Sequence, residues 1–259
     1  MDLGIKGRKA IICASSKGLG RACATSLARE GVIIYLNARN EAVLNETAAE
    51  LRAETGATVY AVAADINTEA GRAKLIAACP SADILVNNNA GPPPGKIEDW
   101  DRKAWNGAIE ANMLAPIFMI QALVPGMRDR KFGRIVNITS AMVKSPRPAM
   151  GLSTAARAGL IAFSKSLSID VAVHNVTINN LLPERIDTDR QKFMAERMMK
   201  EGGITYEEAR KRIAASIAAK RLGHPTEFGD ACAYLCSDQA SFISGQNLQI
   251  DGGSYAGLI

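Results

Sequence analysis

The chain has 259 residues, enough for one α/β domain with a sizeable core, and no Pro-, Gly- or Ser-rich linker divides it in two. Hydrophobic residues make up 47% and charged residues 22%, which excludes an intrinsically disordered chain. The net charge of +5 is spread along the sequence, so it favours a solvated surface or an acidic cofactor over a nucleic-acid-binding face.

The cysteines and histidines form no metal-binding pattern. Five Cys and two His occur, without a C-x-x-C pair or the spacing of zinc ligands. We therefore expect free thiols, no metal and a reducing, cytoplasmic location. The N-terminus lacks the regions of a signal peptide, and no apolar run has the length of a membrane span, so no membrane association is expected.

The first predicted unit is a strand, a glycine-bearing turn and a helix. Arg8–Ala14 is an apolar run typical of a buried strand, Ser15–Gly20 forms the turn, and Arg21–Glu30 has helical spacing that Gly31 ends. Glycine lets the backbone approach a pyrophosphate, and the positive end of a helix dipole attracts the anion. The turn is a candidate nucleotide site, although Gly-x-Gly also occurs in ordinary loops.

Strands and helices alternate through the rest of the chain. The pattern predicts a doubly wound parallel sheet of the Rossmann type, seven-stranded and covered by helices on both faces, with ligands at the carboxyl ends of the strands. The further predicted strands are Val32–Ala38, Ala57–Ala64, Ala82–Asn87, Gly133–Thr139, Asn175–Leu182 and Asn247–Asp251. The further predicted helices are Glu41–Thr55, Thr68–Cys79, Trp100–Lys131, Ser153–Val173 and Thr226–Ser237, with a polar helical excursion over Asp189–Lys220.

Several motifs then occur in a fixed order. Cys13–Gly20 is similar to a TGxxxGxG turn in which Cys and Ala replace Thr and the first Gly, and Asn87–Gly91 reads NNNAG, one residue longer than NNAG. Further along the chain come Asn112, Ser140 at the end of NITS, Pro183, Gly245 and the DGG of Asp251–Gly253. Together these motifs resemble the short-chain dehydrogenase/reductase family over essentially the whole length, and its 3-oxoacyl-[acyl-carrier-protein] reductase branch in particular.

The resemblance implies one domain over residues 1–259 with a substrate lid at about 184–220. It also implies a homo-oligomer, often a tetramer, that transfers hydride between a nicotinamide cofactor and a small-molecule ketone or secondary alcohol. The proposed cofactor contacts lie in the glycine turn, at the strand ends and after the sixth strand: Ser15, Ser16, Lys17, Gly18, Leu19, Gly20, Arg39, Asp65, Ile66, Asn88, Asn89, Arg157, Pro183, Glu184, Ile186 and Thr188.

The end of the second strand indicates which nicotinamide cofactor is used. NAD-dependent enzymes place an Asp or Glu there, whereas this chain has Ala38 followed by Arg39. Arg39 and Lys17 would flank a 2′-phosphate, so NADP(H) is expected in preference to NAD(H). The alternative is that both side chains only face solvent, and Asp65 has a similar alternative as a simple strand-end turn.

The catalytic slot departs from the family. The resemblance places the catalytic Asn and Ser at Asn112 and Ser140, but the family's Tyr-x-x-x-Lys pair falls on Ser153 and Arg157. A serine hydroxyl is shorter and less acidic than a phenol, and arginine stays protonated, so neither copies the usual proton transfer. Arg157 shares a helix face with Ser153 and is expected to keep the electrostatic and ribose-binding roles.

A replacement proton donor must then come from elsewhere in the site. Lys144 is the first candidate, with Tyr206 and Tyr255 behind it, and the alternative for Lys144 is an exposed loop lysine. Glu184 either binds substrate or pairs with Arg185 at the surface. Two other functions stay open: a nucleotide-binding sensor or structural protein without turnover, and a dehydration or epimerisation on the same scaffold.

Overall fold

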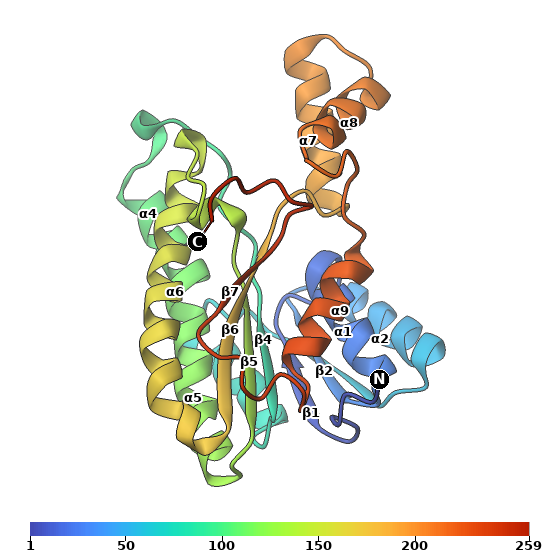
Figure 1. The fold of residues 1–259 in the computed structure, drawn as a ribbon, viewed down its shortest axis with the longest axis vertical. Coiled ribbons are helices and arrows are strands. Elements are labelled where there is room, and N and C mark those ends of the chain that lie inside the picture. Colours follow the sequence, from blue (N-terminus) through green and yellow to red (C-terminus); the bar gives the residue numbers. More distant parts are fainter. Residues whose placement is uncertain (259) are drawn as a thin grey trace.

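The computed structural model describes residues 1–258. Seven parallel strands form one sheet in the order β3-β2-β1-β4-β5-β6-β7, and helices cover both of its faces (Figure 1). The Rossmann-type fold expected from the sequence is therefore confirmed. The strands are β1 (Lys9–Ile12), β2 (Ile33–Ala38), β3 (Val59–Ala63), β4 (Ile84–Asn87), β5 (Gly133–Ile138), β6 (Val176–Pro183) and β7 (Asn247–Ile250).

The helices differ from the expected ranges mainly at their ends. The long predicted helix over 100–131 is divided by a π-helical turn, η2 (Glu110–Leu114), and the polar excursion forms two helices. The helices are α1 (Gly18–Arg29), α2 (Glu41–Thr55), α3 (Glu69–Ala78), α4 (Arg102–Ile109), α5 (Ala115–Asp129), α6 (Gly151–Val171), α7 (Asp189–Gly202), α8 (Tyr206–Ala215) and α9 (Pro225–Leu235).

Two apolar cores lie on opposite faces of the sheet. Helices α1, α2 and α9 pack on one face, and α3, α5 and α6 pack on the other. Ile11 and Ile12 are neighbours in β1 but belong to different cores, because successive side chains of a strand point to opposite faces. A strand that is buried on both faces therefore reads as a continuous apolar run, as β1 does.

The strand order fixes where a ligand can bind. The chain runs from β1 outward to β2 and β3, and then returns to place β4 on the other side of β1. Loops that leave β1 and β4 therefore diverge, and ligands of such sheets bind at this switch point, beyond the carboxyl ends of the strands. The candidate residues of the sequence analysis follow β1, β2, β3, β4, β5 and β6 at this same edge.

Helices α7 and α8 project beyond that edge of the sheet (Figure 1). They have a small core of their own, in which Ala195, Ala209 and Ile213 are buried and Tyr206 packs at the margin. The glycine pair at the end of α7 separates the two helices, and Gly203 adopts a left-handed conformation with φ 61°.

The helical run from Arg102 to Asp129 corrects one expectation. By length and composition it is apolar enough to cross a membrane, so the expectation that no apolar stretch has the length of a membrane span is wrong. In the fold, Met119, Ile120 and Met127 of this run are fully buried in the core between α5 and the sheet. Core helices of this kind meet the same test, so the run is weak support for a membrane span.

Candidate functional site

The glycine turn after β1 is shaped by close backbone contacts. Gly18 has φ 59°, and a Cβ on Gly20 would lie 2.5 Å from the carbonyl oxygen of Ala14 and 2.9 Å from the Cα of Ser15. Ser15 itself is tied to the sheet, because its Oγ donates to the carbonyl oxygen of Ile12 at 2.8 Å. Only glycine fits position 20, so the sequence there is set by the path of the backbone.

The first turn of α1 faces the switch point without a side-chain cap. Lys17 is the N-cap residue and makes no capping hydrogen bond, and the first turn carries no acidic residue. The first N–H groups of α1 are therefore available to an anion, and the helix dipole favours one. Thr188, from the segment after β6, lies beside this turn, with its Cγ2 3.9 Å from the Cβ position of Gly18.

The ends of β2 and β3 carry one cation and one carboxylate. Arg39 is exposed and has no ion-pair partner among residues 1–258, whereas Lys17 contacts Asp189 of α7 at 3.5 Å. Asp65 accepts a hydrogen bond from the backbone N–H of Asn67 at 3.0 Å, so it stabilises the strand-end turn that the sequence analysis gave as its alternative role. No acidic side chain follows β2 where NAD-dependent enzymes have one.

A row of asparagines crosses four strands just below the site. Asn87 donates to Asn137 at 2.9 Å, Asn137 to Asn180 at 3.0 Å, and Asn180 to Asn247 at 2.9 Å, each from Nδ2 to Oδ1. These residues are direct partners in the β4-β5-β6-β7 register. We call this row the asparagine ladder; the sequence analysis missed it, although its members stand at the same depth of four predicted strands.

Asn112 lies in the π-helical turn η2, a type of turn that is frequent at functional sites. Its Nδ2 contacts the carbonyl oxygens of Ala90 and Ala108 at 3.4 Å, and its Oδ1 is buried without a partner. Asn87 Oδ1 and Arg157 Nε are also buried and unpartnered. All three residues line one small cavity, together with Asn88 and Asn89.

Ser153 and Arg157 lie where the sequence analysis placed the catalytic pair, on the first turns of α6. Both are buried, with 3% and 9% of their surfaces exposed. Arg157 donates from Nη1 to the carbonyl oxygen of Thr139 at 3.2 Å and from Nη2 to that of Asn89 at 3.5 Å. Burial, and then the charge of Arg190, lower the pKa of Arg157 to about 10, so the guanidinium stays protonated at neutral pH.

Gly91 covers this pair, which the sequence analysis did not foresee. A Cβ on Gly91 would lie 3.4 Å from Arg157 Nη2 and 3.8 Å from Ser153 Oγ. The extra asparagine of the NNNAG motif was a signal that this loop differs from its four-residue counterpart. Where the longer loop goes depends on tertiary packing, which the motif does not encode.

The loop after β5 brings three of the expected residues to one area. Ser140 accepts a hydrogen bond from the N–H of Met142 at 3.2 Å and begins the short helix η3 (Ala141–Val143). Lys144 is partly buried and lies over the ring of Tyr255, with Nζ 5.3 Å from the ring centroid. Tyr206, which the sequence also offered as a candidate proton donor, does not join this group, because its side chain packs against the small core of α7 and α8.

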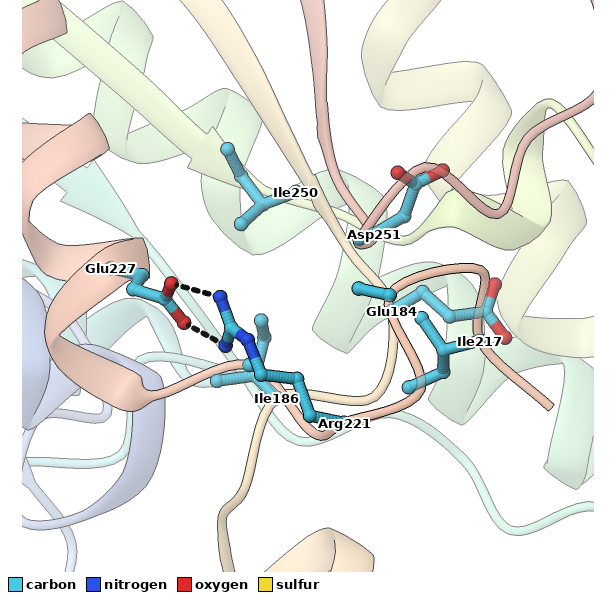
Figure 2. A pocket seen from close by; sticks show the side chains of 10 residues that line it. Glu184, Ile186, Ile217, Arg221, Glu227, Ile250 and Asp251 are labelled. Carbon is cyan, nitrogen blue, oxygen red and sulfur yellow. Dashed lines mark hydrogen bonds and ion pairs between the residues drawn. The ribbon is translucent and has the colours of Figure 1, made fainter. Parts of the chain in front are cut away.

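Glu184 is engaged in ion pairs with two arginines. Its Oε1 lies 2.8 Å from Arg147 and 3.7 Å from Arg185, and its side chain is 10% exposed. This is the ion-pair alternative of the sequence analysis, with Arg147 as the closer partner. Glu184 and Ile186 also line a cavity of about 100 Å³. In this cavity the carboxylate of Glu184 points away from the ion pair of Arg221 and Glu227 (Figure 2).

The five cysteines are free thiols, and Cys13 is the one that borders the site, beside Asn88. All are buried, and none belongs to a disulfide. Burial raises the pKa of Cys13, the one closest to the glycine turn in sequence, to about 12, so it is a thiol and not a thiolate. Within residues 1–258 no cluster of His, Cys, Asp or Glu has the arrangement of a metal site.

Comparison with known proteins gives matches over nearly the whole chain. Residues 13–255 match the family model described as enoyl-(acyl carrier protein) reductase. The NADPH-dependent reductase BacG of Bacillus subtilis is 32% identical, over 95% of this chain and 97% of its own length. The 3-oxoacyl-[acyl-carrier-protein] reductase FabG of Escherichia coli is 30% identical, over 98% of this chain and 99% of its own length.

A solved structure is similar over its entire length. L-sorbose reductase from Gluconobacter frateurii, crystallised with NADPH and L-sorbose, superposes with a TM-score of 0.94 at 31% identity, and the match covers 100% of both chains. The carbonyl compounds named for these relatives differ from one another, so the similarity does not select a substrate.

Proposed function

Because the chain belongs to the short-chain dehydrogenase/reductase family, we propose that it is an NADP(H)-dependent oxidoreductase that interconverts a ketone and a secondary alcohol. The observation that carries the proposal is the uncapped N-terminus of α1 behind a turn that only glycine fits at position 20. Two of the compared relatives are NADPH proteins by name or by bound ligand, which supports NADP(H) as the cofactor.

The side chains around the turn fit a cofactor with a 2′-phosphate. Ser16, Gly18, Leu19 and Gly20 would present the pyrophosphate to the start of α1, and Thr188 would close it from the other side. Arg39 is exposed, has no ion-pair partner in the described part of the chain and would meet the 2′-phosphate, with Lys17 nearby. The base and ribose contacts would come from Asp65, Ile66, Asn88, Asn89, Pro183 and Ile186.

The reaction needs a hydride and a proton. A bound NADPH would supply the hydride that the carbonyl carbon accepts. Ser140 would hold the carbonyl oxygen by a hydrogen bond, and this oxygen takes a proton from the protein as the alcohol forms. Asn112 would orient a water beside Arg157, since both line the same cavity.

The proton donor is the non-standard part of the proposal. The Ser153 hydroxyl is too short to reach the substrate oxygen as a tyrosine would, and it is too weak an acid to protonate that oxygen. Arg157 stays protonated, so a further group is required as the proton donor. Lys144 is our candidate because it follows Ser140 in the same loop and is partly buried. Tyr255, whose ring lies beneath Lys144 Nζ, is the second candidate. We also propose that residues 184–220, with α7 and α8, act as the substrate lid.

The test is NADPH oxidation over a panel of ketones, with NADPH binding measured separately. We expect turnover by the wild type, a loss for Ser140→Ala, and a fall of about 10²–10⁴-fold for the variant that removes the donor, Lys144→Ala or Tyr255→Phe. Lys103→Ala, an exposed lysine of α4, is the control. NADPH binding without turnover of any ketone would favour the nucleotide-binding alternative instead.

A further inference from the structure

We propose that the substrate is an oxo acid and that its carboxylate pairs with Arg157; the proposal rests on the reductase function above and specifies its substrate class. Arg157 is a buried cation at the reacting end of the site. Its two hydrogen bonds, to Thr139 and Asn89, go to neutral carbonyl oxygens, and its Nε has no partner. A buried charge is unfavourable unless it is paired, so this site lacks an anion.

The protein's own carboxylates near the lid do not supply that anion. Three acidic residues follow β6, and each is already paired: Glu184 with Arg147 at 2.8 Å, Asp187 with Arg210 at 2.7 Å, and Asp189 with Lys192 at 3.3 Å. No carboxylate among residues 1–258 forms an ion pair with Arg157.

The charge of the lid that shifts the pKa of Arg157 has the same sign as Arg157. Arg190, in the first turn of α7, lowers the pKa of Arg157 by its charge. Arg190 is exposed and lies 5.8 Å from the ring of Phe193, and no ion pair holds it within the described part of the chain. The lid therefore adds a like charge, and not a compensating one, to the surroundings of Arg157.

The phosphates of the cofactor are too distant to neutralise Arg157. They would bind at the turn after β1, whereas Arg157 contacts Thr139 at the end of β5. Strand β4 lies between β1 and β5, so two strand spacings, about 9–10 Å, separate these ends. The remaining source of an anion at Arg157 is the substrate.

Gly91 is the residue that a ligand must approach to reach the guanidinium. It is exposed, and its ideal Cβ position lies 3.4 Å from Arg157 Nη2 and 3.8 Å from Ser153 Oγ. Because glycine has no side chain, a ligand can come closer to the backbone there, and so to Arg157, than any other residue would allow. A planar carboxylate suits arginine, whose fork of N–H donors binds it by two parallel hydrogen bonds.

The experiment is calorimetric titration of the full chain, saturated with NADP⁺ so that no hydride is transferred, with acetoacetate and its neutral analogue acetoacetamide. We expect the wild type to bind acetoacetate at least about tenfold more tightly, a factor typical of one charge-assisted contact. Arg157→Gln should abolish the difference, and Arg157→Lys should retain part of it, because lysine keeps the charge but not the fork.

Two further variants keep the result interpretable. Gly91→Ala, which places one methyl group between ligand and guanidinium, should weaken acetoacetate binding even if Arg157→Gln does not fold. Arg29→Gln, which removes an equal charge from the far end of α1, should bind as the wild type does. Equal binding of both probes, no binding of acetoacetate, or an equal loss in Arg29→Gln would overturn the inference.

The titration tests the anion site independently of the proposed reductase function. Arg157-dependent binding of acetoacetate without reduction of any ketone would support the anion site and refute the reductase. Efficient NADPH-dependent reduction of acetoacetamide, with no preference for acetoacetate, would support the reductase function and refute the anion site.

Discussion

Asp187 and Arg210 form an ion pair with two parallel hydrogen bonds, from Nη1 to Oδ1 and from Nη2 to Oδ2, each 2.7 Å long. Asp187 belongs to the segment after β6, where its N–H donates to the carbonyl oxygen of Gly223, and Arg210 belongs to α8. The pair therefore joins the base of the projecting helices to the body of the protein.

Replacing Asp187 by Asn should loosen α7 and α8. The pair is partly exposed, so we expect a modest effect, with limited proteolysis of residues 189–220 faster by about two- to fivefold. Arg212→Gln is the matched control, because it removes an equal charge from α8 but breaks only the pair with Glu208 inside that helix. Equal proteolysis of both variants would contradict a role for Asp187 at the base.

The same pair should respond to acid. Hydrogen bonds from Arg210 hold the pKa of Asp187 below its usual value. A carboxyl with a lowered folded-state pKa stabilises the fold above its unfolded value, near 3.9, and loses that contribution as the pH falls through the folded value. Proteolysis of the 189–220 segment should therefore rise below about pH 4 in the wild type, and that acid-induced rise should shrink in Asp187→Asn.

Gly20→Ala should damage the cofactor site. The new methyl group would lie 2.5 Å from Ala14 O, so the turn must shift, at a cost of about 1–3 kcal/mol in unfolding free energy. We expect NADPH affinity to fall by more than about tenfold. Gly107→Ala in α4 is the control, since nothing lies within 4 Å of its Cβ position, and it should gain about 0.5–1 kcal/mol.

Neutralising the cations at the 2′-phosphate position should change cofactor preference. In Arg39→Gln/Lys17→Gln, we expect the KM for NADPH to rise by roughly tenfold or more and the KM for NADH to change little. Initial rates with each cofactor measure this. If both KM values rise together, the two side chains act on the shared part of the dinucleotide or on the lid contact with Asp189.

Restoring the family's tyrosine at position 153 should not restore its chemistry. Ser153 is 3% exposed and lies under Gly91, so a phenol ring has no room there. We expect Ser153→Tyr to lose about 1–3 kcal/mol in chemical denaturation and to gain no ketone reduction. Ser153→Ala, which removes only the hydroxyl, should stay close to the wild type in stability.

Asn137→Leu should destabilise the sheet. The substitution leaves Asn87 Nδ2, Asn180 Oδ1 and Ser164 without a hydrogen-bond partner, which costs about 1–3 kcal/mol for each buried group that stays unsatisfied. Urea denaturation measures the loss. Asn106→Leu, at an exposed position of α4, should change stability by less than about 0.5 kcal/mol.

The sequence predicted all seven strands because each is a short run rich in apolar residues that stands between helical patterns; the central strands β4, β5 and β6 are buried almost throughout. Helix α2 was predicted with its observed ends, since Asn40 caps its start and Gly56 ends it in the left-handed conformation. The π-helical turn around Asn112 had no such signal, because hydrogen bonds to i+5 leave no distinct residue pattern. The glycine turn and the Ser153/Arg157 pair were identified by motif, whereas the contact of Gly91 with that pair depends on how a loop folds over a distant helix.

The asparagine ladder bears on how insertions are accommodated beside the site. Parallel strands of apolar side chains alone tolerate a shift along one another more readily than strands joined by four specific amides. With Asn87 held opposite Asn137, β4 cannot slide to absorb the additional asparagine of NNNAG. The additional residue therefore belongs to the loop after the strand, and Gly91 of this loop lies over Ser153 and Arg157 of α6. A fixed strand register thus leaves the loop, and not the strand, to accommodate a one-residue change in length beside the binding surface.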